Sequence, residues 1–154
     1  MNGRHRVAQY LFQAKEWLLT ADLNQFFGEM QEDFLAGRLA NVARRLSQPL
    51  VVYSASGVTV LRGWNDVLKR VEMYREALDA LSTSTGMFEL VSEDSLINNR
   101  LRVTLRTIYV DHEGVEVTSS LSRYFLVRDG DSFLVEMIEY LEFPLPLERS
   151  ARVH

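Results

Sequence analysis

The stretch that decides the fold runs from Met87 to Phe143 and reads MFELVSEDSLINNRLRVTLRTIYVDHEGVEVTSSLSRYFLVRDGDSFLVEMIEYLEF. Three short polar segments interrupt it, at Asn98-Asn99, Asp111–Gly114 and Arg128–Gly130. Between these segments, apolar and polar residues alternate with the period of two that is typical of a half-buried strand. The stretch therefore predicts an antiparallel meander of four strands joined by tight turns.

The form of each turn predicts how the neighbouring strands pair. Asp111–Gly114 is typical of a three-residue hairpin that ends on a left-handed glycine, and such a turn pairs Tyr109 with Val117. Apolar side chains then face one another at every second pair, which supports the register independently of the turn. The other pairs predicted from the turns are Leu105 with Leu121, Leu101 with Phe125, Phe125 with Phe133, Leu121 with Met137, Val117 with Leu141, Leu90 with Thr107, and Asp94 with Val103.

The last hairpin leaves two registers open. A three-residue turn over Arg128–Gly130 places Glu139 on the inner face of the sheet. A two-residue turn at Asp129-Gly130 shifts the last strand by one residue and brings Glu136 inward instead. The first register is favoured because it turns the apolar side chains of that strand toward the core. These side chains are Phe133, Val135, Met137 and Leu141.

The predicted registers divide the sheet into two unlike faces. The inner face is apolar, and we expect helices to cover it. The outer face mixes charged, aromatic and apolar residues, which suits an interface between subunits as well as a solvated face with cross-strand Glu–Arg pairs. We expect a homodimer that forms through the outer face, at Arg102, Arg106, Tyr124, Ile138 and Tyr140.

Apolar residues at helical spacing precede the meander. Val7–Leu18 predicts a short amphipathic helix. Asp22, with Gln25 three residues later in capping-box position, predicts the start of a second helix. Leu39–Leu46 predicts a shorter third helix, which Pro49 brings to an end.

A small hairpin and a long helix are predicted next. The hairpin joins Leu50–Tyr53 to Val58–Leu61, and the helix spans Trp64–Leu81 with its apolar residues at steps of three and four. The polar face of that helix is expected to carry two i,i+4 ion pairs, Asp66 with Arg70 and Arg75 with Asp79.

Composition limits the classes of function. A chain of 154 residues with 47% hydrophobic and 25% charged residues has the make-up of one globular domain. It has no cysteine, which excludes disulfides and zinc–thiolate sites and fits a cytoplasmic location. The net charge of −4 gives no electrostatic reason to expect nucleic acid or a membrane surface as a partner. No apolar stretch reaches the roughly 20 residues of a membrane span.

The element order resembles the nuclear transport factor 2-like superfamily, which includes ketosteroid isomerases and polyketide-cyclase-like proteins. The resemblance covers about Phe26 to Pro144 and is carried by Phe34–Leu39, Gly57–Gly63 and Asp129–Val135. It implies an α+β cone, or cystatin-like roll, in which the curved meander and the short hairpin wrap around three helices and enclose an apolar pocket. Residues 1–21 are then a helical extension, residues 22–146 the domain and residues 147–154 a tail. The resemblance also implies dimers through the outer sheet face.

Glu139 is the candidate catalytic residue. In the favoured register it faces inward, and a carboxylate held against apolar walls has the raised pKa that a general base needs. The alternative is that Glu139 lies solvated at the rim. Arg123 is the other charged residue expected on the inner face, where it forms an ion pair with Asp94 or captures an anionic group of a ligand.

Other inward residues are candidates for ligand binding or for plain core. Aromatic side chains with a hydroxyl or indole donor suit a pocket that holds a polar ligand atom. Thr107 and Ser119 share a row with Glu139 in the predicted sheet. The ligand-binding candidates are Tyr53, Trp64, Tyr74, Thr107, Tyr109, Ser119 and Arg123.

The histidines argue against several catalytic classes. His5 and His154 lie near the termini and His112 lies in a turn, so none is expected inside for a triad or a metal site. We expect no cofactor and no metal. The leading hypothesis is therefore a domain that binds a small, mostly apolar ligand without strong catalytic machinery. Two alternatives stay open: an isomerase, dehydratase or hydrolase with Glu139 as base and Tyr53 or Tyr109 polarising the substrate, and an interaction module with a filled core.

Overall fold

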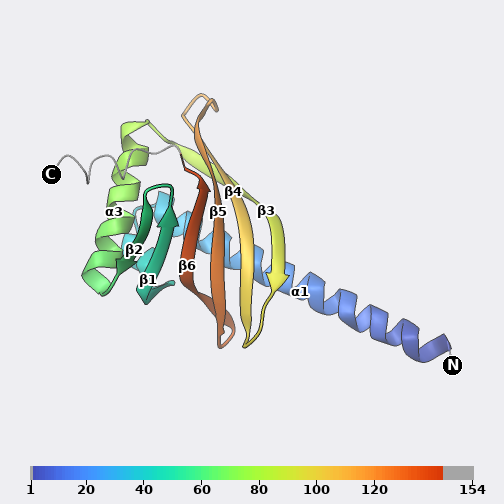
Figure 1. Ribbon diagram of the computed structural model, residues 1–154. Coiled ribbons are helices and arrows are strands. Elements are labelled where there is room, and N and C mark those ends of the chain that lie inside the picture. The colour runs from blue at the N-terminus through green and yellow to red at the C-terminus, as the bar shows by residue number, and fades with distance from the viewer. Residues whose placement is uncertain (1, 144–154) are drawn as a thin grey trace.

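The computed structural model describes the backbone of residues 2–143 and the side chains of residues 18–143. Its strands form a sheet of six in the order β2-β1-β6-β5-β4-β3, and its helices lie against one face of that sheet (Figure 1). The elements are α1 (Asn2–Leu35), α2 (Leu39–Ala43), β1 (Leu46–Ser54), β2 (Gly57–Leu61), α3 (Trp64–Ala80), β3 (Thr85–Ser95), β4 (Arg100–Val110), β5 (Glu116–Asp129) and β6 (Ser132–Glu142).

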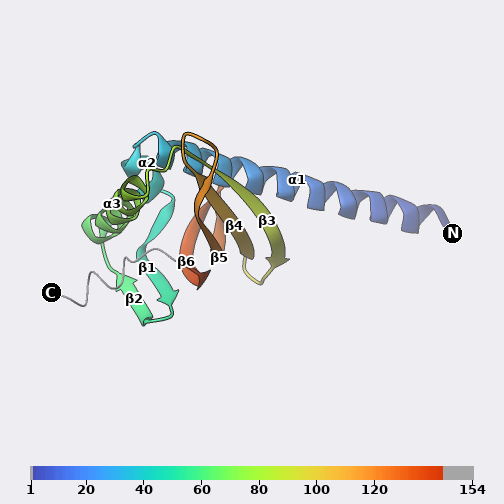
Figure 2. The same cartoon turned by 90° about the horizontal axis from the view of Figure 1, so that it is seen from above.

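The sheet is strongly curved, and the helices occupy its hollow side. The second half of α1 runs across this side, with α2 and α3 next to it, while the first half of α1 extends past β3 (Figures 1 and 2). The prediction of an α+β fold with a curved meander, a short hairpin and helices on one face is confirmed. The predicted tail of residues 147–154 lies outside the described residues.

Helix α1 is continuous, so the predicted start of a new helix at Asp22 is wrong. Neither glycine nor proline separates the two predicted segments, and burial of Leu23 and Phe26 gives the helix a reason to run on through this region. Asp22 lies within this helix, and its carboxylate is 3.5 Å from the guanidinium of Arg128. Thr20, two residues earlier, donates a hydrogen bond of 2.7 Å to Glu93 on β3 and so helps to fix α1 on the sheet.

Helix α3 forms where the apolar spacing predicts it. Val67, Val71 and Leu78 are buried, and they share one face of the helix. Of the two predicted ion pairs, Arg75 with Asp79 is present at 3.0 Å. The other is wrong, because Arg70 makes no ion pair among the described residues and instead borders the cavity described below.

The short hairpin is confirmed and is tied to the meander by a parallel pairing. Val52 faces Thr59 within the hairpin, and it also pairs with Ile138 of β6 in the parallel direction. β1 begins at Leu46, which was expected to end the preceding helix. Leu46 is buried in the core. An apolar residue can be buried at the start of a strand as well as in a last helical turn, so its hydrophobicity did not distinguish the two.

The predicted register between β4 and β5 is right at the turn and wrong beyond it. Val110 pairs with Glu116, as the hairpin requires, but the register then shifts and Tyr109 pairs with Thr118. Val117 is the extra residue, a β-bulge of the kind that increases local twist and bends a strand. From there every side chain of β5 points to the face opposite the predicted one.

β6 begins in phase with the prediction and then changes face. The turn occupies Gly130 and Asp131, since Asp129 pairs with Ser132, and so neither predicted turn is correct. Phe133 and Val135 face inward as predicted. The register between β5 and β6 then shifts by one residue at Glu136. Ile138 and Tyr140 then face inward and Met137 and Glu139 outward, because one inserted residue reverses the alternation.

The pairing of β3 with β4 differs from the prediction without changing most of the inner face. Leu90 pairs with Leu105 rather than with Thr107, a difference of two residues that preserves the face. A shift at Val91 then moves the end of the strand by one residue, so that Asp94 lies opposite Arg102.

The core contains about half of the predicted inner face. The predicted members that are buried are Leu101, Val103, Leu105, Tyr109, Phe133 and Val135, and Phe88, Leu90 and Val117 pack against them. The predictions for Leu121, Phe125, Met137 and Leu141 are wrong, because the bulges turn these residues outward. Their places are taken by Ser120, Ser122, Tyr124, Leu126, Ile138 and Tyr140.

Cross-strand ion pairs cover much of the outer face. Arg123 pairs with Glu139 at 3.1 Å, and Arg102 pairs with Asp94 at 3.1 Å. The predicted Arg123–Asp94 pair is therefore wrong. Of the residues expected to form a dimer interface, Arg102 and Arg106 lie on the outer face, whereas Tyr124, Ile138 and Tyr140 face inward.

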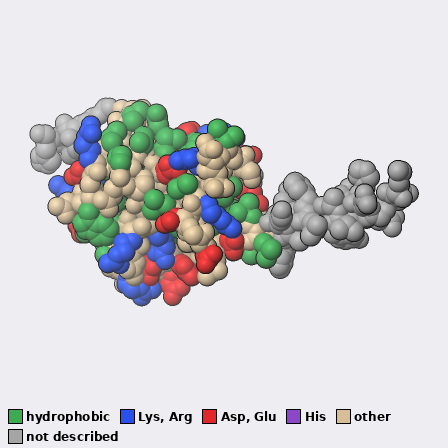
Figure 3. Space-filling model, turned by 90° about the horizontal axis from the view of Figure 1, so that it is seen from below, with side chains coloured by type: hydrophobic (Ala, Val, Ile, Leu, Met, Phe, Trp, Pro, Cys, Tyr) green, Lys and Arg blue, Asp and Glu red, His purple; other side chains and the backbone are tan. Residues whose placement is uncertain are grey.

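Charged and apolar side chains are interspersed on the surface. The face seen from below shows hydrophobic groups set among basic and acidic ones (Figure 3). None of the described helices combines the length and the hydrophobicity of a membrane-spanning segment.

Candidate functional site

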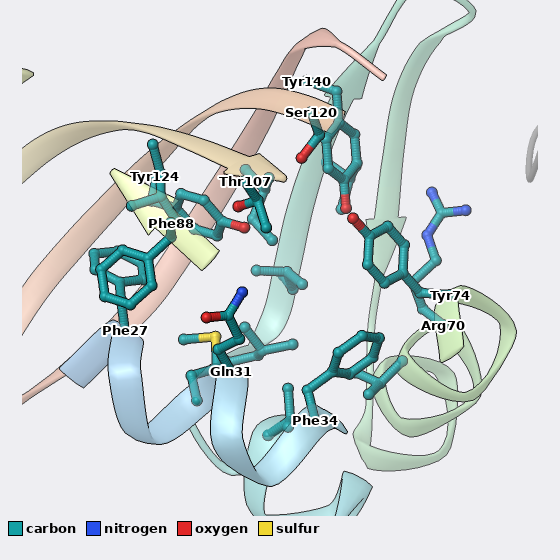
Figure 4. A pocket seen from close by; sticks show the side chains of 18 of the residues that line it. Phe27, Gln31, Phe34, Arg70, Tyr74, Phe88, Thr107, Ser120, Tyr124 and Tyr140 are labelled. Carbon is teal, nitrogen blue, oxygen red and sulfur yellow. The ribbon is translucent and has the colours of Figure 1, made fainter. Parts of the chain in front are cut away.

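A cavity of about 110 Å³ lies between the hollow face of the sheet and the helices (Figure 4). This volume is well above the roughly 10–15 Å³ that one water molecule needs, and it is close to that of engineered cavities, about 150 Å³, that bind a single aromatic ring. The cavity is mostly apolar, with a few polar groups that converge on it, as is usual for small-molecule sites.

The helices supply one wall of the cavity. Phe27, Gln31 and Phe34 lie on a single stripe of α1, because residues four and seven positions apart share a helical face. On α3, Arg70 and Tyr74 are likewise four residues apart; Tyr74 faces the cavity, and Arg70 borders it at the edge. The two helices together thus provide the aromatic wall and two polar side chains, those of Gln31 and Arg70.

The sheet supplies the opposite wall. Alternate residues of each strand point inward, so β4 contributes Leu105, Thr107 and Tyr109. The bulges decide which residues of the next two strands join them. These are Ser120 and Tyr124 on β5, and Ile138 and Tyr140 on β6.

Among the described residues, four tyrosines line the cavity. Burial raises the pKa of three of them. Burial raises the pKa of Tyr74 well above the ordinary value of about 10, and the hydrogen bond with Tyr109 raises it further. Burial likewise raises the pKa of Tyr109, although the hydrogen bond with Tyr74 acts in the opposite direction. The pKa of Tyr124 is raised by burial and by the neighbouring Tyr140. At neutral pH these hydroxyl groups therefore stay protonated and can donate hydrogen bonds.

Ring contacts hold the aromatic walls in place. The rings of Phe27 and Tyr124 meet edge to face with centroids 5.2 Å apart, which fixes the contact between α1 and β5. The ring of Tyr74 stacks on Phe143 at 5.3 Å, and Phe143 also contacts Tyr140 at 4.2 Å. Aromatic walls that are packed from behind move little, so the cavity is largely preformed.

Close packing at the end of the cavity explains why position 86 holds a glycine. A Cβ atom at Gly86 would lie 2.9 Å from both Nε2 of Gln31 and Cδ1 of Tyr109. Gly86 therefore lets β3 approach these two side chains, and their positions against the cavity depend on it. Figure 4 shows Gln31 directed from α1 into the cavity, beneath Thr107 and Tyr124.

Arg70 is the one residue with a formal charge among the described residues that line the cavity. Its Nε atom is buried and has no hydrogen-bond partner in the described part of the chain. Figure 4 shows the guanidinium beside Tyr74, at the edge of the cavity. No carboxylate lines the cavity within residues 18–143, so no acidic side chain of the lining pairs with Arg70.

The structure brings together three of the predicted ligand-binding residues. Tyr74, Thr107 and Tyr109 line the cavity. Trp64, at the start of α3, packs against the core without reaching the cavity.

The remaining predicted site residues are elsewhere. Glu139 and Arg123 face outward and pair with each other, so neither is available inside the cone. Ser119 faces outward next to Ser120, and Tyr53, next to Val52, is 42% exposed on the outer face. The register errors on β5 and β6 account for Glu139, Arg123 and Ser119.

Sequence reasoning missed several lining residues. For Gln31 and Arg70, the helical spacing held the signal, because each stands four residues from an aromatic residue of the cavity wall. For Ser120, Tyr124 and Tyr140, no comparable signal exists in the sequence, because their inward position depends on β-bulges at Val117 and Glu136.

The cavity offers hydrogen-bond donors and one cation, and it offers neither an acid nor a histidine among the described residues. The part of the chain with described side chains also holds no group of three or more histidine or acidic residues that could ligate a metal. The arrangement suits recognition of an apolar body with oxygen atoms at its edge.

No protein-family model matches the sequence, and no curated protein matches it at a significant level of similarity. Solved structures do match. Aln2 from a Streptomyces species is 13% identical, with a TM-score of 0.64 over 88% of this chain and 96% of that chain. An NTF-2 like protein of unknown function from Shewanella oneidensis is 16% identical, with a TM-score of 0.60 over 79% of this chain and 97% of that chain.

A third similar structure contains a bound molecule. It is a protein from Catenulispora acidiphila in complex with S-DNPA, 15% identical, with a TM-score of 0.61 over 89% of this chain and 98% of that chain. At such identities the likeness establishes the fold and leaves the activity open. The chain has the nuclear transport factor 2-like fold, an α+β cone whose curved sheet wraps around its helices.

Proposed function

We propose that this protein is a small-molecule-binding domain whose cavity takes a ligand with an aromatic ring and oxygen atoms. The observation that carries the proposal is an apolar cavity onto which protonated hydroxyl groups converge from three strands and a helix. Apolar walls favour the ring through its removal from water, and the hydroxyl groups select its orientation.

The size of the cavity limits the ligand. At about 110 Å³, it suits a body of one ring more than a multi-ring system lying wholly inside. A likeness of fold supports the proposal from outside the chain, since the similar Catenulispora acidiphila protein was solved with S-DNPA.

The catalytic alternative based on Glu139 loses its general base. Glu139 lies outside the cavity and is engaged by Arg123 at 3.1 Å. Tyr109 could still polarise a substrate oxygen, but burial raises its pKa and so keeps it from acting as a base at neutral pH. The geometry therefore favours binding over isomerase, dehydratase or hydrolase chemistry.

The alternative of a filled core is also less favoured. A module of that kind packs its interior with its own side chains, whereas this cavity has room for several water molecules or one small ligand. A homodimer through the outer face, with Arg102 and Arg106 in the contact, and a cytoplasmic location remain part of the proposal. The cysteine-free composition supports the latter.

A matched pair of serine variants tests the proposal. Ser120→Phe projects a ring into the cavity, and Ser119→Phe places the same ring on the outer face of the same strand. The probe is benzamide, and its Kd is measured by calorimetry or ligand-detected NMR. We expect Ser120→Phe to raise the Kd about tenfold or more and Ser119→Phe to leave it within about twofold.

Thermal unfolding of both variants verifies that they fold, since overpacking costs about 1–3 kcal/mol. Equal effects of the two substitutions on benzamide binding would contradict the assignment of the cavity as the binding site. If neither benzamide nor its charged analogue benzoate binds the unmodified protein, up to the solubility of each probe, the proposed function itself is contradicted.

A further inference from the structure

We propose that the ligand of this cavity carries a carboxylate and that Arg70 recognises it. The inference rests on the proposed function and narrows its ligand to aromatic carboxylates of one ring. Arg70 is the sole charged residue on the cavity wall in the described part of the chain, and its Nε atom is buried without a hydrogen-bond partner there.

A buried donor without a partner is costly, and more so when the group is charged. Proteins therefore leave few such groups in place, and each one calls for a reason such as a ligand. On α3, the i,i+4 neighbour Asp66 was available to Arg70, yet the two make no ion pair. Arg70 lies at the edge of the cavity instead, with its guanidinium beside Tyr74 (Figure 4).

A second arginine of the same helix provides a comparison. Arg75 pairs with Asp79 at 3.0 Å, and its guanidinium lies 5.8 Å from the centre of the Phe34 ring. One of its Nη atoms is also unpaired, but its charge has a carboxylate partner. Arg70 has no carboxylate partner in the described part of the chain. A carboxylate of a bound ligand would pair with Arg70 as Asp79 pairs with Arg75.

The guanidinium favours one kind of anion. Its planar fork matches a carboxylate or a phosphate through two parallel hydrogen bonds. The apolar walls and the limited volume favour an aromatic carboxylate over a heavily hydrated phosphate ester. Tyr74 stands beside Arg70, so its ring forms the part of the cavity wall next to the guanidinium (Figure 4).

Benzoate and benzamide test the inference, because they have the same shape and differ in charge. The Kd of each probe is measured at pH 7 for the unmodified protein, Arg70→Gln and Lys69→Gln. We expect benzoate to bind the unmodified protein about tenfold more tightly than benzamide. Arg70→Gln should reduce this ratio to within about twofold, and Lys69→Gln, which removes a neighbouring exposed charge, should leave it unchanged.

The outcomes separate this inference from the proposed function. Equal affinities of benzoate and benzamide for the unmodified protein overturn the role of Arg70 while leaving a binding cavity in place. A ratio that survives Arg70→Gln overturns it as well. If neither probe binds, both the inference and the proposed function fail. Should Arg70→Gln not fold, Arg70→Lys takes its place, and it should lower the ratio because it retains the charge but loses the fork.

Discussion

The kind of side chain that lines this cavity was predicted from the sequence, but only some of the individual residues were. The sequence suggested hydroxyl-bearing side chains in an apolar pocket, and Tyr74, Thr107 and Tyr109 do line one. Their positions follow from helical spacing on α3 and strict alternation along β4, neither of which is interrupted. The predictions for Glu139 and Arg123 were wrong, because β-bulges elsewhere in their strands determine which face of the sheet these residues occupy.

Gly86 packs so closely against two side chains that an added methyl group should lower the stability of the protein. Gly86→Ala should destabilise the protein by about 1–3 kcal/mol, because the new methyl group would lie 2.9 Å from both Gln31 and Tyr109. The matched control is Gly28→Ala in α1, where the nearest atom is Cε1 of Phe88 at 3.9 Å. That change should stabilise the protein by about 0.5–1 kcal/mol through helix propensity. Urea unfolding of both variants measures the difference, and equal effects would contradict the packing at Gly86.

Secondary-structure elements were predictable to a greater extent than their registers. Turn residues marked each of the four meander strands, and the apolar period marked α3. The bulges at Val117 and Glu136 left no comparable mark, since a bulge needs only one extra residue and is favoured by the curvature of the whole sheet. A single inserted residue then moved Tyr124 inside and Phe125 outside.

The outer sheet face carries the prediction of a dimer. Arg106 and Leu121 are cross-strand neighbours on this face, so Arg106→Glu combined with Leu121→Asp should place acidic groups in the contact and yield monomers. Sedimentation equilibrium of the native protein and of this variant measures the change, with Arg44→Glu, just after α2, as a control of similar charge. A dimer that persists in the double variant, or a native protein that is monomeric, would refute the interface.

At the scale of the whole molecule, the order of elements was enough to predict the fold. Helices, hairpin, long helix and meander follow one another in the chain, and the sheet they form encloses the helices as the resemblance implied. The parallel pairing of β1 with β6 closes one side of the cone, and it joins segments more than eighty residues apart. Pairing across such a separation leaves no local pattern, which is why the cavity could be expected from the topology but its lining only in part.

The most direct test of the account is the position of a bound ring. Nuclear Overhauser contacts between the ring protons of benzamide and methyl or ring protons of the protein show which face of the sheet the probe meets. We predict contacts to Tyr124 and Ile138, which line the cavity. Contacts to Leu121 and Met137, on the opposite face of the same two strands, without contacts to the first pair, would contradict the assignment of the inner cavity as the binding site.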